Sequence, residues 1–302
     1  MAFKQVTIIG TGLIGGSLGL ALKKRRLAGR IIGCDRAPVL ERARDCGAID
    51  AGTTNPADAV RGSDLVVLAT PVIATLDLIG RLGPTLGPTL PPKTLVTEVG
   101  STKAEIVQRA AKSFGRNAGQ RFLAGHPMAG KEHAGVEFAD ADLFEGTAWL
   151  FTPLPGQNVH AGLCGEFIHC AEKMGAKIAV LDPADHDRFC AWISHLPQMI
   201  STALAAALVD EFGSDAPVLD IGGRALREMT RISGSPYSMW RDIAITNRKN
   251  LSDVLLKLEQ RLAHIRENLD SRELATEFER AHQLKKSPLR KRVEKSGDRI
   301  IG

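Results

Sequence analysis

Two loops near the middle of the chain carry side chains that could share or move a proton. Ser101 follows Gly100 in one loop, and His126 lies between Gly125 and Pro127 in the other. A neutral imidazole accepts protons well near neutral pH, and the proline restricts the backbone that holds it. A histidine that only caps a loop is the competing interpretation. We take His126 as the candidate general base of an oxidation and the Ser101 loop as a second candidate site.

The second half of the chain offers another histidine and a group of arginines. His195 lies in an apolar helical stretch, where a histidine is more often a satisfied core residue than a functional one. Arg227 and Arg231 are one helical turn apart, which a solvated helix face would also explain. However, Arg231 has small and apolar neighbours, a setting more typical of an arginine that binds a carboxylate. We therefore keep His195 and Arg231 as candidate site residues.

The spacing of the histidines does not match a metal site. A metalloenzyme helix typically carries two histidines four residues apart, as in H-E-x-x-H. No such spacing relates His126, His133, His186 and His195. We expect no metal.

The first 35 residues contain the pattern of a dinucleotide-binding turn. A short apolar strand leads into Gly10-Thr11-Gly12-Leu13-Ile14-Gly15, and a helical stretch follows. In such a turn Gly10 permits the sharp bend, Gly12 lets the backbone approach a pyrophosphate, and Gly15 lets the helix pack closely on the sheet. The N–H groups of the first helical turn favour an anion. The pattern predicts a dinucleotide-binding site.

The residues after the second strand bear on the choice of cofactor. Asp35 lies 20 residues after Gly15, where a carboxylate can accept hydrogen bonds from the adenosine ribose. The negative charge of Asp35 would repel the 2′-phosphate of NADP, although Arg36 could form an ion pair with that phosphate. We expect NAD, with NADP as a weaker alternative. Two further strands end at the same edge of the sheet, one at Thr70-Pro71 and one at Gly100. We place these residues in the cofactor site, together with Leu13 and Ile14.

Strands and helices alternate along the first 182 residues, which predicts an α/β fold with a doubly wound, mostly parallel sheet. Helix 101–114 should be capped by Ser101, because Glu105 and an apolar period follow it. The expected strands are 6–9, 31–35, 64–69, 94–99, 122–125, 149–151 and 177–181, and the expected helices are 13–27, 38–46, 72–82 and 101–114.

After Asp182 only helical periodicity remains. One apolar stripe is formed by Phe189, Ile193, Leu196, Ile200 and Leu204, with Pro197 expected to kink the helix. Another runs from Leu251 to Ile265. We expect residues 1–182 to bind the dinucleotide, 183–284 to form an all-helical substrate and dimerisation domain, and 285–302 to form a basic tail.

Composition excludes several classes of protein. Seven of the 39 Lys/Arg and two of the 34 Asp/Glu lie between residues 285 and 299, which accounts for the whole net charge of +5. The basic character therefore belongs to the tail, and we expect no nucleic-acid partner. The five cysteines show no C-x-x-C spacing and fit reduced thiols. We found no uninterrupted apolar run of about 20 residues and no leader, so we expect a cytoplasmic protein that does not bind membranes.

Six motifs in order resemble the prephenate/arogenate (cyclohexadienyl) dehydrogenase family of tyrosine biosynthesis. The resemblance spans about residues 6 to 269, and its middle motifs are far more specific than the glycine turn. It implies a Rossmann domain followed by a helical domain that dimerises, and NAD(P)-dependent oxidative decarboxylation of prephenate or arogenate. The motifs are GLIGGS at 12–17, GSTK at 100–103, GHPMAG at 125–130, SHLP at 194–197, TRI at 230–232 and MWRD at 239–242.

The resemblance also assigns roles to individual residues. His126 resembles the catalytic histidine that accepts a hydrogen bond from the ring hydroxyl, and Ser101 the serine that contacts this hydroxyl and the nicotinamide. His195 matches a substrate-side histidine, and Arg231 the arginine that holds a substrate carboxylate. The expected substrate residues are completed by Glu132 at the pocket edge, Arg227 and Trp240. The chain departs from the family at Gln198, where some members have histidine, and at Arg227-Glu228, which replaces a Lys-Asp pair.

Two other functions fit parts of the pattern. A β-hydroxyacid dehydrogenase shares the two-domain plan but typically uses a lysine base beside an Asn/Gly cluster in its helical domain, and we find no comparable lysine. A dinucleotide-sensing protein without turnover would need the glycine turn but neither His126 nor Arg231. The sequence does not distinguish prephenate from arogenate, and it does not show whether tyrosine inhibits the protein.

Overall fold

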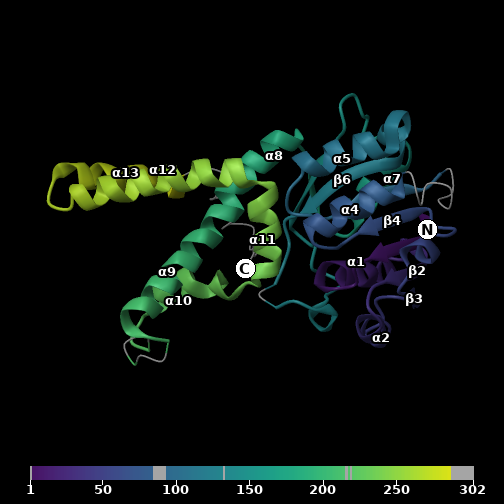
Figure 1. Cartoon of the computed structure of the whole chain (residues 1–302), viewed down its shortest axis with the longest axis horizontal. Helices are drawn as coiled ribbons and strands as arrows, with labels where there is room; N and C mark the ends of the chain where they lie inside the picture. The colour runs from purple at the N-terminus through teal and green to yellow at the C-terminus, as the bar shows by residue number, and fades with distance from the viewer. Residues whose placement is uncertain (1, 84–92, 132, 215–216, 218–219, 287–302) are drawn as a thin grey trace.

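The structure, a computed structural model, describes residues 2–83, 93–131, 133–214, 217 and 220–286. The proline-rich stretch 84–92, which the sequence predicts to be a loop, lies outside the described residues, as do Glu132 and the tail beyond Lys286. A mixed sheet with helices on both faces occupies the first 180 residues, and only helices follow it in the described part of the chain (Figure 1). The predicted fold class is confirmed.

The eight strands have the order β3-β2-β1-β4-β5-β6-β7-β8. All neighbouring pairs are parallel except β6 and β7, which are antiparallel. The order reverses beside β1, so the carboxyl ends of β1 and β4 flank a topological switch point, where ligands bind in such sheets. The strands are β1 (Phe3–Ile9), β2 (Ala28–Cys34), β3 (Ala51–Thr53), β4 (Leu65–Leu68), β5 (Leu95–Glu98), β6 (Phe122–Pro127), β7 (Ala148–Thr152) and β8 (Lys177–Val180).

Alternating residues of each central strand pack into two separate cores. In β4, Leu65 and Val67 point into one cluster, and Val66 and Leu68 into the other. Such burial on both faces explains why β4 is apolar throughout. The helices around the sheet are α1 (Leu13–Lys24), α2 (Ala37–Asp45), α3 (Pro56–Ala59), α4 (Val72–Leu82), α5 (Ala104–Phe114), α6 (Ala118–Arg121) and α7 (Gly162–Lys173).

The expected cap of α5 is wrong. This helix begins at Ala104, and Ser101 does not cap it. Instead Asp187, more than eighty positions along the chain, accepts the N–H groups of Lys103 at 2.7 Å and Ala104 at 2.9 Å. A carboxylate at this position also has a favourable interaction with the helix dipole. A tertiary contact has therefore replaced the local cap that the sequence favoured.

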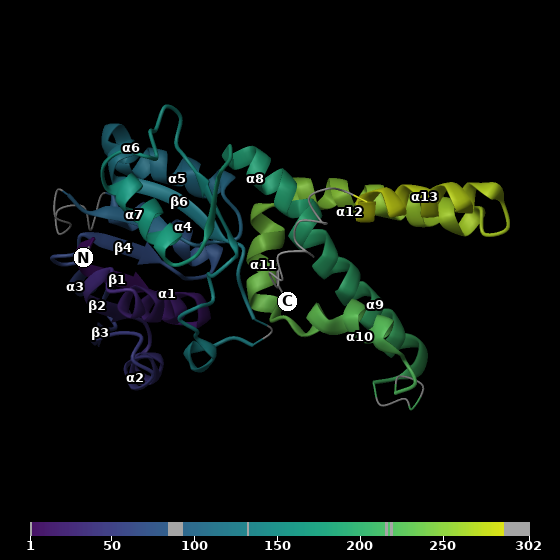
Figure 2. The same ribbon diagram turned by 180° about the vertical axis from the view of Figure 1, so that it is seen from behind.

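The helical part extends away from the sheet in two arms. Figures 1 and 2 show α9 with α10 along one arm and the antiparallel pair α12 and α13 along the other, with α11 beside the sheet. A π turn at Ala191–His195 joins α8 to α9, just before Pro197, which lacks a backbone N–H. The helices are α8 (Pro183–Cys190), α9 (Leu196–Phe212), α10 (Arg224–Thr230), α11 (Tyr237–Thr246), α12 (Arg248–Glu267) and α13 (Arg272–Lys286).

Much of the apolar surface of these helices is exposed. Ile193 is 64% exposed and Leu262 57%, although both lie in stripes that the sequence assigned to helix packing. Among the described residues, the segment Pro183–Phe212 is also long and apolar enough to cross a membrane, with only 22% of the tested window buried. Polar residues interrupt this segment, so the sequence shows no uninterrupted apolar run there. One such helix is weak evidence for a membrane protein, because a helix whose apolar face packs on a partner subunit has the same length and composition.

Hydrogen bonds fix the helical part against the carboxyl edge of the sheet. Asp242 of α11 accepts the N–H of Ile73 at the start of α4 at 3.1 Å. The hydroxyls of Thr102 and Thr246 are 2.8 Å apart. Together with the Asp187 contacts to α5, these bonds place the start of the helical part directly over the strand ends that carry Ser101 and His126.

Candidate active site

The glycine turn lies at the topological switch point between β1 and β4. Gly10 has a φ of +92°, and a Cβ added there would lie 2.4 Å from the carbonyl oxygen of Ala69, which follows β4. A Cβ at Gly15 would lie 1.9 Å from the Gly10 oxygen. Both positions therefore require glycine for the close approach of turn, helix and strand. Thr70 and Pro71 follow at the same edge of the sheet, between β4 and α4.

The start of α1 is suited to an anion. Gly12 is its N-cap residue, no side chain caps the helix, and the first turn contains no acidic residue. A Cβ built on Gly12 would have nothing within 4 Å, so the backbone here is open to approach. The N–H groups of Leu13 and Ile14 belong to this first turn, which suits a pyrophosphate. These features fit a dinucleotide.

Asp35 is held firmly at the end of β2. Its Oδ2 accepts the backbone N–H of Thr11 at 2.8 Å, and its Oδ1 accepts that of Arg36 at 2.8 Å. The side chain remains half-buried, and a carboxylate has acceptor sites left for ribose hydroxyls. Arg36 is exposed. The carboxylate therefore has a fixed position beside the glycine turn, whereas the arginine is not held by burial.

A buried ion pair joins the two loops predicted to do chemistry. Lys103 and Glu98 are both fully buried, and the ammonium also donates to the carbonyl of Gly125 at 2.7 Å. Glu98 accepts the N–H groups of Gly100 at 2.7 Å and Gly125 at 3.1 Å. Burial raises the pKa of Glu98 and lowers the pKa of Lys103, while the opposite charge of each partner offsets the shift. Because every group that faces Glu98 is a donor, we assign it as a carboxylate.

His126 lies near the end of β6, directly after Gly125, and is 7% exposed. Its pKa is held well below the usual 6.5, first by burial and then by the neighbouring His186, Lys103 and His195. The imidazole is therefore neutral at neutral pH and able to accept a proton. Ser101 follows β5, the strand next to β6, so the two predicted catalytic residues lie on adjacent strand ends.

Three residues that we did not select from the sequence surround these histidines. The Nε2 of His186 lies 2.9 Å from the Nδ1 of His126, and Asp187 contacts the other nitrogen of His186 at 2.9 Å. Asn247 donates to the Nδ1 of His195 at 3.2 Å. His186 was considered only as a metal ligand. The adjacent His-Asp pair at the start of a helix was a usable signal, whereas nothing local pointed to Asn247.

His195 is fully buried and packs edge-on against Trp240, with ring centroids 5.9 Å apart. Burial lowers its pKa to about 4, so it too is neutral. Within the described residues, the Nε2 of His195 and the Nε1 of Trp240 are buried without a hydrogen-bond partner. Buried polar atoms are normally satisfied, so these two atoms in contacting rings are available to polar atoms of a ligand.

The arginines lie further out along the helical part. Arg227 in α10 and Arg231 just after it are both exposed. The segment that carries Arg231 is joined to α9, because Gln198 donates to the Ile232 carbonyl at 2.9 Å, one turn beyond His195. The structure thus brings Arg231 toward the His195 side of the site but does not bury it.

A possible metal-binding group is better explained by hydrogen bonding. Ligand atoms of His126, His186 and Cys190 lie within 4.8 Å of one another. The two imidazoles already face each other at hydrogen-bonding distance, and burial raises the pKa of the Cys190 thiol to about 12. The hydrogen bond between the two imidazoles accounts for their proximity without an ion. We therefore assign no metal to it.

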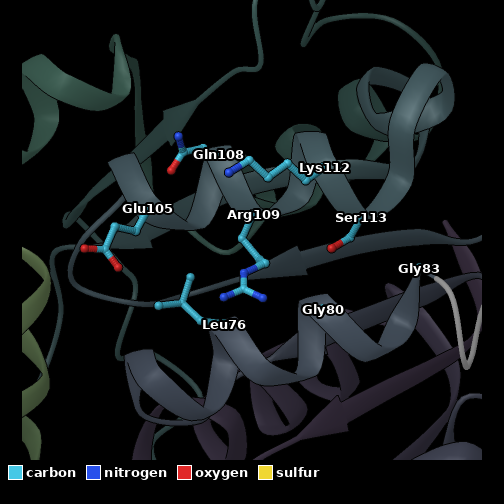
Figure 3. A pocket seen from close by; sticks show the side chains of 8 residues that line it. All are labelled: Leu76, Gly80, Gly83, Glu105, Gln108, Arg109, Lys112 and Ser113. Carbon is cyan, nitrogen blue, oxygen red and sulfur yellow. The ribbon is translucent and has the colours of Figure 1, made fainter.

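A separate cavity of about 700 Å³ lies between α4 and α5, away from the histidines (Figure 3). Arg109 of α5 lies over Gly80 of α4, with a guanidinium nitrogen 3.2 Å from where a Cβ of Gly80 would be. Lys112 and Glu105 line the same opening. None of our candidate residues lines this cavity, and we assign it no part in the chemistry.

Comparisons with known proteins agree with this geometry. Residues 18–180 match the family described as prephenate dehydrogenase, nucleotide-binding domain, and residues 182–283 match its dimerization domain. A prephenate dehydrogenase of Lactococcus lactis is 31% identical over 273 residues, 85% of this chain and 72% of that protein. A cyclohexadienyl dehydrogenase of Zymomonas mobilis is 29% identical over 255 residues, 84% of each chain. The crystal structure of prephenate dehydrogenase from A. aeolicus with hydroxyphenyl propionate and NAD+ has a TM-score of 0.80 at 29% identity, covering 94% of this chain and 97% of that one.

Proposed function

The chain belongs to the prephenate dehydrogenase family, and we propose that it catalyses the NAD-dependent oxidative decarboxylation of prephenate, arogenate or both. The observation that carries the proposal is a buried, neutral histidine at the same carboxyl edge of the sheet as the dinucleotide crevice. Residues 1–182 would bind the cofactor, 183–284 would complete the substrate site and dimerise, and 285–302 would form a tail. All five cysteines are free, which suits the cytoplasm.

The chemistry needs little from the protein beyond orientation and one proton acceptor. Bound NAD supplies the hydride acceptor. His126 accepts a hydrogen bond from the ring hydroxyl and takes up its proton, while the ring carbon that bears this hydroxyl gives up hydride. The opposite carboxylate leaves as carbon dioxide, and the ring becomes aromatic. Aromatisation drives the reaction, so the fixed positions of His126 and Ser101 are the main catalytic contribution.

The remaining candidate residues would bind the two carboxylates of the substrate. His195 and Trp240 offer buried nitrogen atoms to its oxygens. Arg231 would hold a carboxylate in a bidentate contact, and Arg227 would add positive charge at the entrance. Glu132 lies outside the described residues, and we propose it at the pocket edge on the resemblance alone.

A lysine-based β-hydroxyacid dehydrogenase fits less well. Its base should lie buried in the helical part, but Lys249 and Lys257 of α12 are exposed. The buried lysine, Lys103, follows β5 and is paired with Glu98. A direct test is to follow NADH absorbance with prephenate and with arogenate. Turnover of neither substrate, with turnover of a simple 3-hydroxyacid, would replace our proposal with the rival.

Cofactor choice gives a first prediction. The unmodified protein should prefer NAD over NADP by at least about tenfold in kcat/KM, roughly 1.4 kcal/mol, because Asp35 would repel a 2′-phosphate. Asp35→Ser should shift the preference toward NADP. Asp35→Asn, which keeps an oxygen for the Thr11 N–H but removes the charge, should shift the preference in the same direction and separates the effect of charge from that of the hydrogen bond. Arg36→Ala should lower the residual NADP activity. Equal use of both cofactors by the unmodified protein would show that Arg36 outweighs Asp35.

Assembly gives a second prediction. We propose a homodimer through the helical part, where most of the exposed large apolar side chains of the described residues lie. The protein should therefore run at twice 32.4 kDa in light scattering. Leu262→Asp should weaken the dimer, because it places a charge in an apolar stripe of α12. Gln260→Asp, on the opposite face of the same helix, should not. A monodisperse monomer at micromolar concentration would contradict the proposal.

A further inference from the structure

We propose that His186 and Asp187 are positioning residues that hold His126 in the tautomer whose Nε2 accepts a proton, and that Asn247 holds His195 in the opposite tautomer. The inference deepens the proposed function and rests on it for its catalytic meaning. The structure supports it through two chains of hydrogen bonds, in which each donor is fixed by a neighbour that can only accept.

The first chain begins at Asp187, which is 2% exposed. Its Oδ1 accepts the N–H of Lys103 at 2.7 Å, and its Oδ2 accepts that of Ala104 at 2.9 Å. Backbone N–H groups only donate, so this side chain must present acceptors on both oxygens, as an ionised carboxylate does. The N-terminus of α5 further favours its negative charge. The nitrogen of His186 that faces this carboxylate at 2.9 Å, Nδ1, must therefore carry a proton.

The chain continues from His186 to His126. His186 is fully buried, and burial, with a smaller contribution from the charge of Lys103, lowers its pKa despite its contact with Asp187. A neutral imidazole with a proton on Nδ1 has a lone pair on Nε2. That Nε2 lies 2.9 Å from the Nδ1 of His126, which must then donate. The Nε2 of His126 is left with its lone pair, as a general base requires.

The charged and titratable groups around this pair do not reverse the assignment. The Cys190 thiol lies 3.5 Å from the Nε2 of His186 and 4.0 Å from the Nδ1 of His126, and it remains a neutral thiol. Lys103 is paired with Glu98, and His195 is neutral. A thiol can add a weak S–H contact to the Nε2 of His186, which keeps that nitrogen an acceptor.

The second chain of hydrogen bonds holds His195 in the opposite tautomer to His126. The amide nitrogen of Asn247 donates to the backbone carbonyl of Asp187 at 2.8 Å and to the Nδ1 of His195 at 3.2 Å. The carbonyl can only accept, so the orientation of the amide is determined, and Asn250 donates to its oxygen at 2.8 Å. Nδ1 of His195 is therefore an acceptor, and the neutral ring carries its proton on Nε2.

The two histidines thus have opposite roles although both are buried and neutral. His126 offers a lone pair to the reacting hydroxyl, while His195 offers a buried N–H without a partner among the described residues. The second role suits a substrate oxygen. Asp187 connects the chains, because its carboxylate orients His186 and its backbone carbonyl orients Asn247.

Two substitutions of His186 separate tautomer control from packing. His186→Phe keeps a ring but leaves Nδ1 of His126 without an acceptor, and it should lower kcat for prephenate by about 100-fold, as for loss of a working base. The KM for NAD should stay within about threefold. His186→Gln can place an amide oxygen near Nδ1 of His126 and should retain at least about tenfold more activity than His186→Phe. Cys170→Ala, which removes a buried thiol from the sheet core without touching this network, should change kcat by less than about threefold.

Equal activity of the Phe and Gln variants, whether high or low, would overturn the inference. Nitrogen-15 NMR of histidine-labelled protein gives a readout without turnover, because protonated and unprotonated ring nitrogens have different shifts. In the unliganded protein, His126 should show a protonated Nδ1 and an unprotonated Nε2, with His126→Asn identifying the signals. The reverse pattern would refute the inference. Failure of the unmodified protein to oxidise prephenate or arogenate would instead refute the proposed function and leave the NMR test standing.

Discussion

Replacing His126 with Asn should lower kcat for prephenate oxidation by about 100-fold or more, the usual effect of losing a positioned general base. The asparagine amide can still donate to His186 from near the position of Nδ1, so the buried hydrogen bond is retained while the acceptor at Nε2 is lost. Affinity for NAD, measured by fluorescence titration, should be unchanged, because the dinucleotide crevice lies at β1 and β4. His169→Asn, on the exposed face of α7, is the control and should leave kcat unchanged.

The same base should give a characteristic pH profile. The pKa of His126 is held well below 6.5, first by burial and then by His186. Protonation removes the acceptor, so kcat/KM should be constant from about pH 7 to 8 and should fall only at pH values well below 6.5. The fall should disappear from the residual activity of His126→Asn. A break at or above pH 6.5 in the unmodified enzyme, or near-normal turnover of the variant, would assign the base to another group.

The sequence predicted the elements whose signals are local. Strand β4 reads as an uninterrupted apolar run because both of its faces are buried, and the glycine turn reads clearly because Gly10 and Gly15 approach other backbone atoms too closely for a side chain. His126 was found because it directly follows the expected strand 122–125, although in the structure it lies near the end of β6. In each case the signal in the sequence is local, although its cause can be distant, as in the approach of Gly10 to Ala69.

The sequence failed where the partner is distant. Ser101 followed by Glu105 is a reasonable local cap, but Asp187 supplies the cap of α5 from the helical part. The same distance hid the relation of Asp187 to His126, since no pattern near either residue shows that His186 lies between them. The exposed apolar stripes have a similar cause: periodicity shows that Ile193 and Leu262 share helix faces with core residues, but it does not show what covers them.

The buried pair of Lys103 and Glu98 gives the largest expected effect on stability. Lys103→Met fits a side chain of similar length into the same space but leaves the Glu98 carboxylate buried without a cation. Breaking such a pair typically lowers the free energy of unfolding by about 3 to 5 kcal/mol. The Gly125 carbonyl also loses a donor at 2.7 Å, next to His126. We therefore expect a large drop in the urea midpoint at fixed protein concentration, and a drop in kcat in the fraction that remains folded.

A second variant distinguishes an uncompensated charge from lost packing. In Lys103→Met with Glu98→Gln, neither position carries a charge, while an amide oxygen can still accept the N–H of Gly125 or Gly100. Part of the lost stability should return, although the amide cannot satisfy both backbone groups as the carboxylate does. Lys249→Met is the control: it breaks a 2.8 Å pair with Asp253 whose lysine is 87% exposed, and the urea midpoint should not change measurably. If the double variant were no more stable than Lys103→Met, the cost would come from packing, and Glu98 would have to be protonated when Lys103 is absent.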